Sequence, residues 1–314
     1  MDQFKWGVIG PMKKAKAFAA DLPYATEEHM VYAVLTDEPE EDTDQWDRPY
    51  VFTELQAFLE SDIDAVYIVS AYQQRYAYAK QCLLNHKPVL CEHPIATDAE
   101  ELEHLIRLSQ NNSTFMLEGL WIRFLPSVKK VLSVVSSGAI GDIISIKASV
   151  HYKNGEASTT TSKKGGALLG LGTYPVFLCV LFLGRPDYIQ GAGSRTSGGV
   201  NEFFSAFLSY EDGQYGLIEA STINKGASYA VIEGDLGFVH IKNPWSVKPE
   251  GIEVDFFDGT KVVHKGEWEG RGLQFEVDEL YKCVKEGEIE SSLYPHQFTL
   301  DVMKTLDDIR QQLK

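Results

Sequence analysis

The first third of the chain alternates short apolar runs with amphipathic stretches, which is typical of buried strands joined by helices. The apolar runs predict strands at residues 4–9, 30–35, 65–70, 89–91 and 115–117. The amphipathic stretches predict helices at residues 14–22, 54–60, 76–85 and 98–110, the last capped by Thr97 or Asp98. Such an alternation predicts an α/β domain with a doubly wound parallel sheet, and right-handed crossovers fix most of its topology.

The pattern changes near residue 140, where β-forming residues become frequent and turns separate closely spaced runs. The expected strands cover residues 143–152, 201–210, 214–222, 228–233, 238–241 and 252–257. Turns such as Asp258-Gly259 indicate hairpins. Helical patterns cover residues 167–183, 273–286 and 296–313. The second half therefore predicts an α+β domain with a large, mostly antiparallel sheet. Helices cover one face, and the other face must meet a partner or solvent.

A chain of 314 residues fits about two domains, since domains commonly contain roughly 100–200 residues. We place the first domain at residues 1–120 and the second at 121–314, and the last helix is a candidate for packing back on the first domain. The acidic stretch 37–47, DEPEEDTDQWD, is expected to form a loop, because its charge and Pro39 disfavour a helix.

The charge and cysteine content narrow the class of protein. The formal net charge of −16 would repel phosphate backbones, so nucleic acid is not an expected partner. The chain has no apolar run of the roughly 18 residues that a membrane helix needs, and its start lacks the pattern of a signal peptide. Its four cysteines form no CxxC pair and are expected to be buried, reduced thiols of a cytoplasmic protein. No histidine spacing indicates a metal site.

The end of the first expected strand carries candidate chemistry for a dinucleotide, because ligands of doubly wound sheets bind outside the carboxyl ends of the strands. This strand ends in the segment Gly10-Pro11-Met12-Lys13-Lys14-Ala15. Gly10 permits a tight turn and Ala15 permits close helix packing. Met12, however, stands where a dinucleotide fingerprint has a glycine that lets the backbone approach the pyrophosphate.

Lys13, Lys14 and Lys16 oppose the dipole of the helix that they begin, which costs about 0.3–1 kcal/mol for each exposed cation. One interpretation is that these lysines contact a bound phosphate. The alternative is a solvated basic helix face. Asp37, which follows the second expected strand, can accept hydrogen bonds from a ribose 2′-hydroxyl and repels a 2′-phosphate. Asp37 thus favours NAD over NADP, unless it simply begins the acidic loop.

Several segments of the chain resemble the Gfo/Idh/MocA oxidoreductases, the family of glucose–fructose oxidoreductase and inositol dehydrogenase. Residues 87–94, KPVLCEHP, are similar to the KPVLCEKP turn of that family. Further similar segments are WGVIG at 6–10, EGLWIRFLP at 118–126, GAIGD at 138–142, GGALLGLGTYP at 165–175 and GLQFE at 272–276. The resemblance covers essentially the whole chain in order, and it is strongest to the branch that includes dimeric dihydrodiol dehydrogenase.

The resemblance implies an N-terminal Rossmann domain that binds NAD or NADP and a C-terminal domain whose open sheet face forms homo-oligomers. It also implies reversible hydride transfer between the nicotinamide and a sugar, a polyol or a related hydroxy compound. In the family, the lysine of a Glu-Lys-Pro turn supplies a cation. A histidine or tyrosine on a helix of the second domain is the general acid–base group, often near an aspartate one turn earlier.

Carried over to this chain, the resemblance makes Tyr174 the acid–base candidate and puts His93 in the place of the lysine. Gly170 stands in the place of the aspartate, and Arg75 stands where the family commonly has a histidine and offers a permanent charge nearby. The expected catalytic residues are therefore Tyr174 and His93. The expected cofactor-binding residues are Gly10, Pro11, Met12, Lys13, Lys14, Asp37, Ser70, Ala71, Arg75, Glu92, His93, Trp121 and Arg123.

Departures at Met12, Ala71, Arg75, His93 and Gly170 fall together in one expected cleft, which points to altered chemistry or to none. Three interpretations stay open: an NAD(P)-dependent oxidoreductase, a non-catalytic nucleotide- or sugar-binding member, and an NAD-assisted lyase or hydrolase. The small-molecule substrate is not predicted, because residues 153–164 read only as a loop. A cis bond is expected between His93 and Pro94, since a tight turn at a ligand site is a usual place for one.

Overall fold

The computed structural model describes residues 3–37, 49–152, 165–246 and 248–313. The chain forms two compact units. The first contains residues 1–124 and 269–296, and the second contains residues 125–268 and 297–314. The acidic stretch expected as a loop, apart from Asp37, and the segment 153–164 lie outside the described residues.

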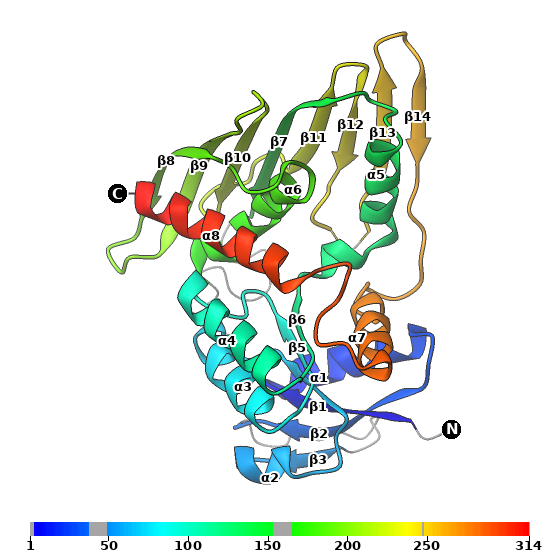
Figure 1. The fold of residues 1–314 in the computed structure, drawn as a ribbon, viewed down its shortest axis with the longest axis vertical. Helices are drawn as coiled ribbons and strands as arrows, with labels where there is room; N and C mark the ends of the chain where they lie inside the picture. Colours follow the sequence, from blue (N-terminus) through cyan, green and yellow to red (C-terminus); the bar gives the residue numbers. More distant parts are fainter. Residues whose placement is uncertain (1–2, 38–48, 153–164, 247, 314) are drawn as a thin grey trace. The chain divides into compact units, whose positions relative to one another are not determined.

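The first unit is built on a parallel sheet of six strands in the order β3-β2-β1-β4-β5-β6 (Figure 1). These strands are β1 (Phe4–Ile9), β2 (His29–Leu35), β3 (Tyr50–Phe52), β4 (Ala65–Ile68), β5 (Val89–Glu92) and β6 (Met116–Gly119). The chain runs outward from β1 to β3 and then returns to place β4 on the other side of β1. This reversal confirms the predicted doubly wound sheet and puts a switch point between β1 and β4.

The helices of the first unit match the predicted pattern, with shifted ends. They are α1 (Met12–Ala19), α2 (Leu55–Leu59), α3 (Tyr72–Leu84), α4 (Ala99–Asn111) and α7 (Gln274–Glu286), with short 3₁₀ turns η1 (Leu22–Tyr24) and η2 (Trp121–Phe124). The predicted cap of α4 is confirmed, because the Asp98 carboxylate accepts a hydrogen bond of 2.9 Å from the Glu101 N–H. Two of the helices begin earlier than predicted, α1 at Met12 and α3 at Tyr72.

Aromatic side chains fix α1 against the centre of the sheet. Trp6 of β1 is fully buried, and its ring centroid lies 5.2 Å from that of Phe18 in an edge-on contact. Phe18 in turn stacks on Tyr67 of β4 at 4.3 Å. Because such ring contacts add to the free energy of burial, they hold the last turn of α1 against β1 and β4.

The second unit carries a mixed sheet of eight strands in the order β14-β13-β12-β11-β7-β10-β9-β8. These strands are β7 (Ile143–His151), β8 (Tyr188–Arg195), β9 (Asn201–Ser209), β10 (Tyr215–Ser221), β11 (Tyr229–Gly234), β12 (Gly237–Lys242), β13 (Gly251–Phe256) and β14 (Lys261–His264). Only β7 and β10 pair in parallel among the described strands of this sheet. The mostly antiparallel sheet is therefore confirmed.

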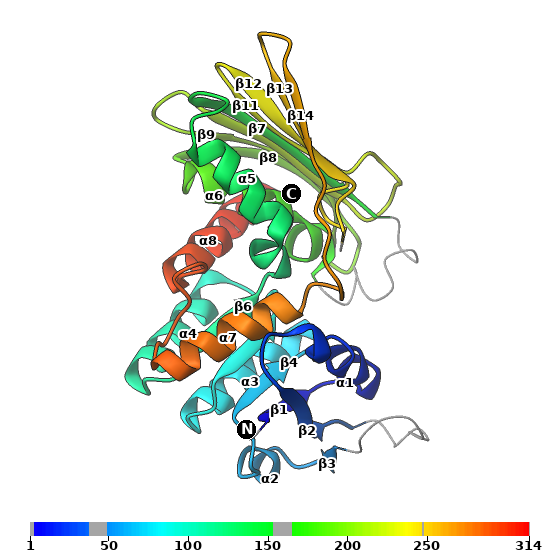
Figure 2. The same ribbon diagram turned by 90° about the vertical axis from the view of Figure 1, so that its right-hand side faces the viewer.

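One face of this sheet is covered by α5 (Pro126–Ser136), α6 (Thr173–Leu183) and α8 (His296–Gln312), as Figures 1 and 2 show. On β7 the alternate residues Ile146, Ala148 and Val150 are buried beneath these helices. Their neighbours Ser145, Lys147 and Ser149 point to the opposite face, as the period of two requires. We call this opposite face the open face.

Three strands that the sequence pattern did not predict, β3, β8 and β14, all lie at sheet edges. An edge strand buries little side-chain surface, so its sequence lacks the apolar run that marks an interior strand. The β8 sequence YIQGAGSR illustrates this, since only Ile189 in it is buried. Helix α5 was also not predicted; it begins at Pro126, where a proline is tolerated in the first turn.

The expected division of the chain needs correction near its end. Residues 269–296, including α7, belong to the first unit, whereas residues 297–314, most of α8, belong to the second. Val277 and Leu280 of α7 are fully buried within the first unit. Phe298 of α8 instead meets Phe177 of α6, with ring centroids 5.7 Å apart. The last helix thus packs within the second unit.

The structure also bears on the expected cis bond, the cysteines and membrane helices. The His93–Pro94 bond is cis, as predicted. All four cysteines are buried and none forms a disulfide, and burial raises the pKa of the Cys82 thiol to about 12, which confirms inert thiols. No helix among the described residues is long and apolar enough to cross a membrane.

Gly7 offers a direct test of the packing between β1 and α2. A Cβ atom at this position would lie 2.5 Å from Cζ of Phe58 and 2.8 Å from Cδ1 of Ile63. Gly7→Ala should therefore lower the free energy of unfolding by about 1–3 kcal/mol, measured by urea titration. Gly198→Ala is the matched control, because a Cβ there meets only Thr196 Oγ1 at 3.6 Å. Equal effects of the two substitutions would refute this packing.

Candidate functional site

A pocket of about 270 Å³ opens at the carboxyl ends of β1, β2 and β4. It lies at the switch point of the sheet, where doubly wound folds bind ligands. We call it the strand-end pocket. Its lining residues are Ile9, Gly10, Pro11, Leu35, Thr36, Asp37, Thr53, Leu55, Ser70, Ala71, Gln74 and Tyr78. The structure therefore brings together five of the predicted cofactor-binding residues: Gly10, Pro11, Asp37, Ser70 and Ala71.

Gly10 has a close-packing role at the floor of this pocket. Its φ of 150° lies in the region that favours glycine. A Cβ atom there would lie 3.0 Å from the Val69 carbonyl carbon and 3.1 Å from the Ser70 nitrogen. The turn after β1 can therefore approach the end of β4 only without a side chain at position 10.

Helix α1 begins beside the pocket without any negative charge of its own. Pro11 is its N-cap, no side chain caps it, and its first turn contains no acidic residue. Such a helix start favours an anion. Lys13 is exposed and Lys14 is half-buried, but neither lines the pocket. Met12 is 5% exposed and packs into the core, so its side chain does not obstruct the pocket.

Arg75 holds two turns of the first unit together. The residue is almost completely buried, and its guanidinium donates to backbone carbonyls. Nε donates to Ser70 O at 3.0 Å, and Nη1 donates to Glu92 O at 3.0 Å and to His93 O at 2.6 Å. Arg75 thus ties the turn after β4 to the turn after β5. The expected role of its permanent charge near His93 stays a prediction.

The turn after β5 is held from several sides. The Tyr67 hydroxyl donates to Glu92 Oε1 at 2.6 Å. Glu118 Oε1 accepts a hydrogen bond of 3.0 Å from the Ile95 N–H. His93 is 7% exposed, so its imidazole lies mostly within the protein. These contacts tie the Glu92–Pro94 turn and the residue after it to β4 and β6 within the first unit.

Two buried carboxyl groups next to this turn were not identified from the sequence. Burial raises the pKa of Glu118 to about 7 and raises the pKa of Glu276 well above its ordinary value. Glu276 lies against Gly119, and its Oε1 has no hydrogen-bond partner among the described residues. Glu276 is distant in sequence from β6, so no local pattern could have indicated the contact.

Trp121 and Arg123 lie in η2, and neither lines the strand-end pocket. Arg123 is 9% exposed. Burial lowers the pKa of its guanidinium, an effect that the Glu279 carboxylate partly opposes. Their expected role beside a nicotinamide stays a prediction.

In the second unit, Tyr174 follows an unusual helical turn. Residues Ala167–Gly172 form a π-helix that continues directly into α6, and such turns are often found at functional sites. Gly172 is needed here, because a Cβ atom would lie 2.6 Å from the Phe204 ring. The half-buried Tyr174 lies beside Trp245, with ring centroids 5.7 Å apart. The Trp245 indole donates to Ser149 O at 2.6 Å, which fixes the position of its ring.

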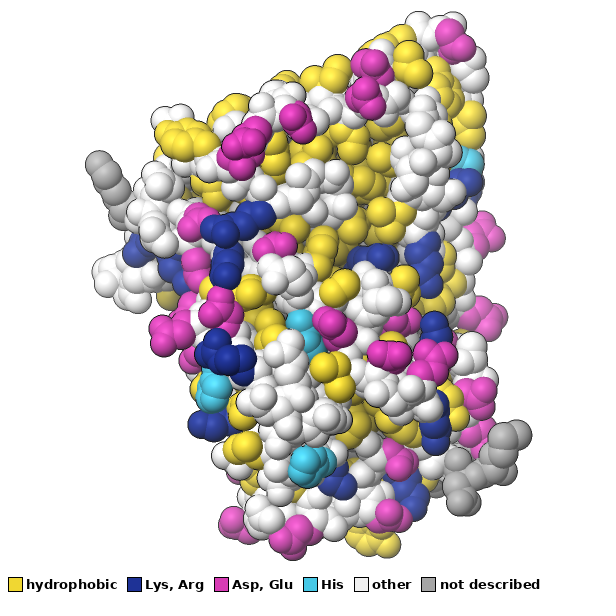
Figure 3. Space-filling model, in the orientation of Figure 1, with side chains coloured by type: hydrophobic (Ala, Val, Ile, Leu, Met, Phe, Trp, Pro, Cys, Tyr) yellow, Lys and Arg dark blue, Asp and Glu magenta, His cyan; other side chains and the backbone are white. Residues whose placement is uncertain are grey.

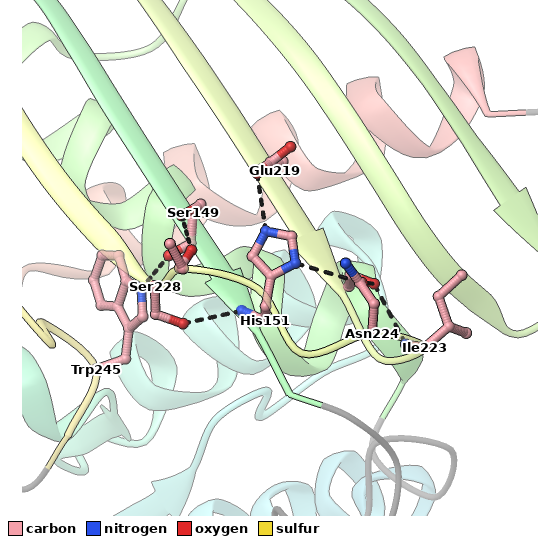
Figure 4. A network of polar contacts seen from close by, with 9 residues as sticks. Ser149, His151, Glu219, Ile223, Asn224, Ser228 and Trp245 are labelled. Carbon is pink, nitrogen blue, oxygen red and sulfur yellow. Dashed lines mark hydrogen bonds and ion pairs between the residues drawn. The ribbon is translucent and has the colours of Figure 1, made fainter.

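A histidine–carboxylate pair occupies the open face of the second sheet (Figure 4). His151 Nε2 lies 2.9 Å from Glu219 Oε1, and its Nδ1 lies 3.5 Å from Asn224 Oδ1. The pair joins β7 to β10, strands that are far apart in sequence, so sequence analysis did not find it. Within the described residues, no group of three or more histidine, cysteine, aspartate or glutamate side chains could hold a metal ion.

Comparison with protein-family models identifies both halves of the chain. Residues 4–119 match the model "Oxidoreductase family, NAD-binding Rossmann fold", and residues 128–240 match the GFO/IDH/MocA C-terminal domain. The chain therefore belongs to the Gfo/Idh/MocA oxidoreductase family, as the sequence resemblance predicted. Its first unit is an NAD(P)-binding Rossmann domain.

Individual relatives agree with this assignment. A trans-1,2-dihydrobenzene-1,2-diol dehydrogenase from Xenopus tropicalis is 28% identical over 80% of this chain and 79% of its own length. The fold resembles a 3-ketoreductase from Actinomadura kijaniata (TM-score 0.84, 19% identity, 100% and 98% of the two chains). It also resembles an aldose–aldose oxidoreductase from Caulobacter crescentus (TM-score 0.85, 15% identity, 99% and 97%).

The residues of the strand-end pocket fit a dinucleotide. Gly10 leaves a cradle that a Cβ atom would fill, and α1 begins without an acidic residue. Asp37 is the one charged residue among the described residues of the lining, at the place where a ribose hydroxyl is commonly bound. We therefore assign the adenosine side of the cofactor to this pocket as an expectation from the geometry.

Glu118 should make the stability of the first unit depend on pH in a way that can be tested. Because its pKa is raised from 4.5 to about 7 on folding, the folded state binds more protons between these values and loses stability as pH rises through that window. Well above pH 7 the free energy of unfolding should be lower by about 3 kcal/mol than at acidic pH. Glu118→Gln keeps an acceptor for Ile95 and removes the charge. Urea titrations should show that the stability of Glu118→Gln relative to wild type rises from pH 5 to pH 8. A difference in free energy of unfolding that stays constant over this range would refute the raised pKa of Glu118.

Proposed function

We propose that this protein is an NAD-dependent dehydrogenase that oxidises a hydroxyl group of a diol, polyol or sugar, with Tyr174 as the general acid–base group. The observation that carries the proposal is the placement of Tyr174. It follows a π-helical turn, lies half-buried beside Trp245, and occupies the segment that resembles the acid–base helix of the family. The relatives described above include a dihydrodiol dehydrogenase and an aldose–aldose oxidoreductase, which supports this substrate class.

Proton balance explains why the reaction needs Tyr174. Oxidation of a secondary alcohol removes a hydride from carbon and a proton from oxygen, and a bound nicotinamide accepts the hydride. The Tyr174 oxygen takes the proton from the substrate hydroxyl, and in the reverse direction it returns it. Since a free tyrosine titrates near 10, this role requires a neighbouring positive charge that favours the phenolate.

His93 is the proposed source of that charge, in the place where the family has a lysine. An imidazole carries only part of a positive charge near neutral pH, so we expect activity to depend on pH more steeply than a lysine would allow. Arg75 does not replace the lysine, because its guanidinium is committed to the carbonyls of Ser70, Glu92 and His93. It supports the turn that carries His93.

A non-catalytic, nucleotide-binding role is the second candidate. Gly170 supplies no carboxylate one turn before Tyr174, and His93 is largely buried. Both features favour a protein that binds a dinucleotide but does not catalyse turnover of a substrate. Binding of NADH together with no turnover on a broad panel of hydroxy compounds would favour this alternative over the dehydrogenase.

The test of the dehydrogenase is turnover of trans-diols, polyols and aldoses with NAD⁺, followed by NADH absorbance. Tyr174→Phe should lower turnover of any accepted substrate by about 10²–10⁴-fold while NADH still binds. Tyr210→Phe is the matched control, because it removes a buried hydroxyl that has no hydrogen-bond partner among the described residues. Equal turnover of Tyr174→Phe and wild type would remove Tyr174 from the mechanism.

We also propose that the protein is a homo-oligomer that associates through the open face. Leu217 is 44% exposed and pairs with Phe207 across β10 and β9. Charges on this face are paired within it: Lys147 with Glu233 and Lys242 with Glu253, each at 2.7 Å. Such pairs lower the cost of removing the face from water. Figure 3 shows the face of the molecule that carries the helices of the second unit, not the open face.

Leu217→Asp should dissociate the oligomer, because the new carboxylate would be buried at the interface without a partner. Leu84→Asp is the control, since Leu84 is equally exposed, at 44%, but lies on α3 of the first unit. Sedimentation equilibrium should give a monomer mass for the first variant and an oligomer mass for the second. A monomeric wild-type protein, or an unchanged mass for Leu217→Asp, would contradict the proposed interface.

A further inference from the structure

The outer end of the strand-end pocket is formed by two elements that meet at Asp37. Thr36 and Asp37 follow β2, while Gln74 and Tyr78 come from α3. Gln74 and Tyr78 are four residues apart, so they lie on the same side of α3, one turn from each other. Tyr78 is half-buried there. The phenol therefore belongs to the pocket wall and is not a solvated surface group.

The Asp37 carboxylate acts on the Tyr78 phenol. Burial raises the pKa of Tyr78, and the negative charge of Asp37 raises it further. Tyr78 consequently keeps its proton at neutral pH, and its hydroxyl stays available as a donor near the carboxylate. Together the two groups offer one donor and several acceptor positions at the same end of the pocket.

The remaining walls indicate what the pocket accepts. Ile9, Leu35, Leu55 and Ala71 supply apolar surface, which suits a flat heteroaromatic ring. Among the described lining residues there is no lysine or arginine, so this part of the wall offers no cation to a phosphate. A hydroxyl-bearing sugar next to an aromatic base matches this combination of groups better than a phosphorylated sugar does.

We propose that Tyr78 is a specificity-determining residue, which acts with Asp37 to bind the 2′-hydroxyl side of the adenosine ribose and to exclude a 2′-phosphate. The inference rests on the proposed NAD-dependent function and extends it from a single carboxylate to a carboxylate–phenol pair. In this arrangement Asp37 accepts a hydrogen bond from the ribose, and Tyr78 donates to the ribose oxygen or to the carboxylate. The hydroxyl of Tyr78 thus contributes to selectivity without carrying charge.

The test compares NADH and NADPH binding to the full-length protein by tryptophan fluorescence or calorimetry. Wild type should prefer NADH. Tyr78→Phe should weaken NADH binding about 3- to 10-fold and change NADPH binding less, so the preference for NADH should fall. Asp37→Asn should reduce the preference further by removing the repulsion of the 2′-phosphate. When Tyr78→Phe is added to Asp37→Asn, the further change in the ratio of NADH to NADPH affinity should be smaller than the change that Tyr78→Phe causes in wild type, since the two groups act as a pair.

Tyr76→Phe is the matched control. Tyr76 lies on the same helix, its hydroxyl bonds to His104 Nδ1 at 2.5 Å, and it does not line the pocket. This control should leave the ratio of NADH to NADPH affinity unchanged. A second measurement uses 5′-AMP and 2′,5′-ADP as probes of the ribose end alone, and Tyr78→Phe should weaken 5′-AMP selectively.

The outcomes separate the inference from the function on which it rests. If wild type binds NADH and Tyr78→Phe leaves the NADH-to-NADPH ratio unchanged, Tyr78 has no role in selectivity and the inference fails while the proposed function stands. If folded wild type binds neither dinucleotide, both fail together. A preference of wild type for NADPH would overturn the assignment of the Asp37–Tyr78 pair as an element that excludes a 2′-phosphate.

Discussion

The hydrogen bonds of the buried Arg75 side chain are the interaction on which the first unit's site depends. A guanidinium has five N–H donors and cannot lose its charge, so it must be satisfied wherever it is buried. Here its Nε and Nη1 donate to the carbonyls of Ser70, Glu92 and His93, which lie at the ends of neighbouring strands. One side chain therefore sets the spacing of two turns, one of which lines the strand-end pocket while the other carries His93.

Buried carboxyl groups complete this arrangement from the other side. Glu118 accepts from the Ile95 N–H, and Glu92 accepts from the Tyr67 hydroxyl. Burial raises the pKa of Glu118, an effect that the nearby positive charge of Arg75 partly opposes, and burial also raises the pKa of Glu276. The turn after β5 is thus anchored to β4, β6 and α3 through side-chain hydrogen bonds.

The sequence predicted the interior of the fold well and its margins poorly. Apolar runs located β1, β2, β4, β5 and β6, whereas the edge strands β3, β8 and β14 had no such signal because they bury little. Gly10 and Asp37, which the local sequence pattern singled out, both line the strand-end pocket. The role of Arg75, the contact of Glu276 with Gly119 and the His151–Glu219 pair depend on long-range packing that no local pattern encodes.

The central claim is that this family member retains a working dinucleotide site at the ends of β1, β2 and β4 despite Met12 and His93. Hydrogen–deuterium exchange with and without NADH tests this claim most directly, because it locates binding along the backbone. We expect NADH to slow exchange in the segments after these strands, 10–15, 36–37 and 70–74, and to leave β8 and β9 unchanged. Uniform exchange with and without saturating NADH, or protection confined to other segments, would contradict the account.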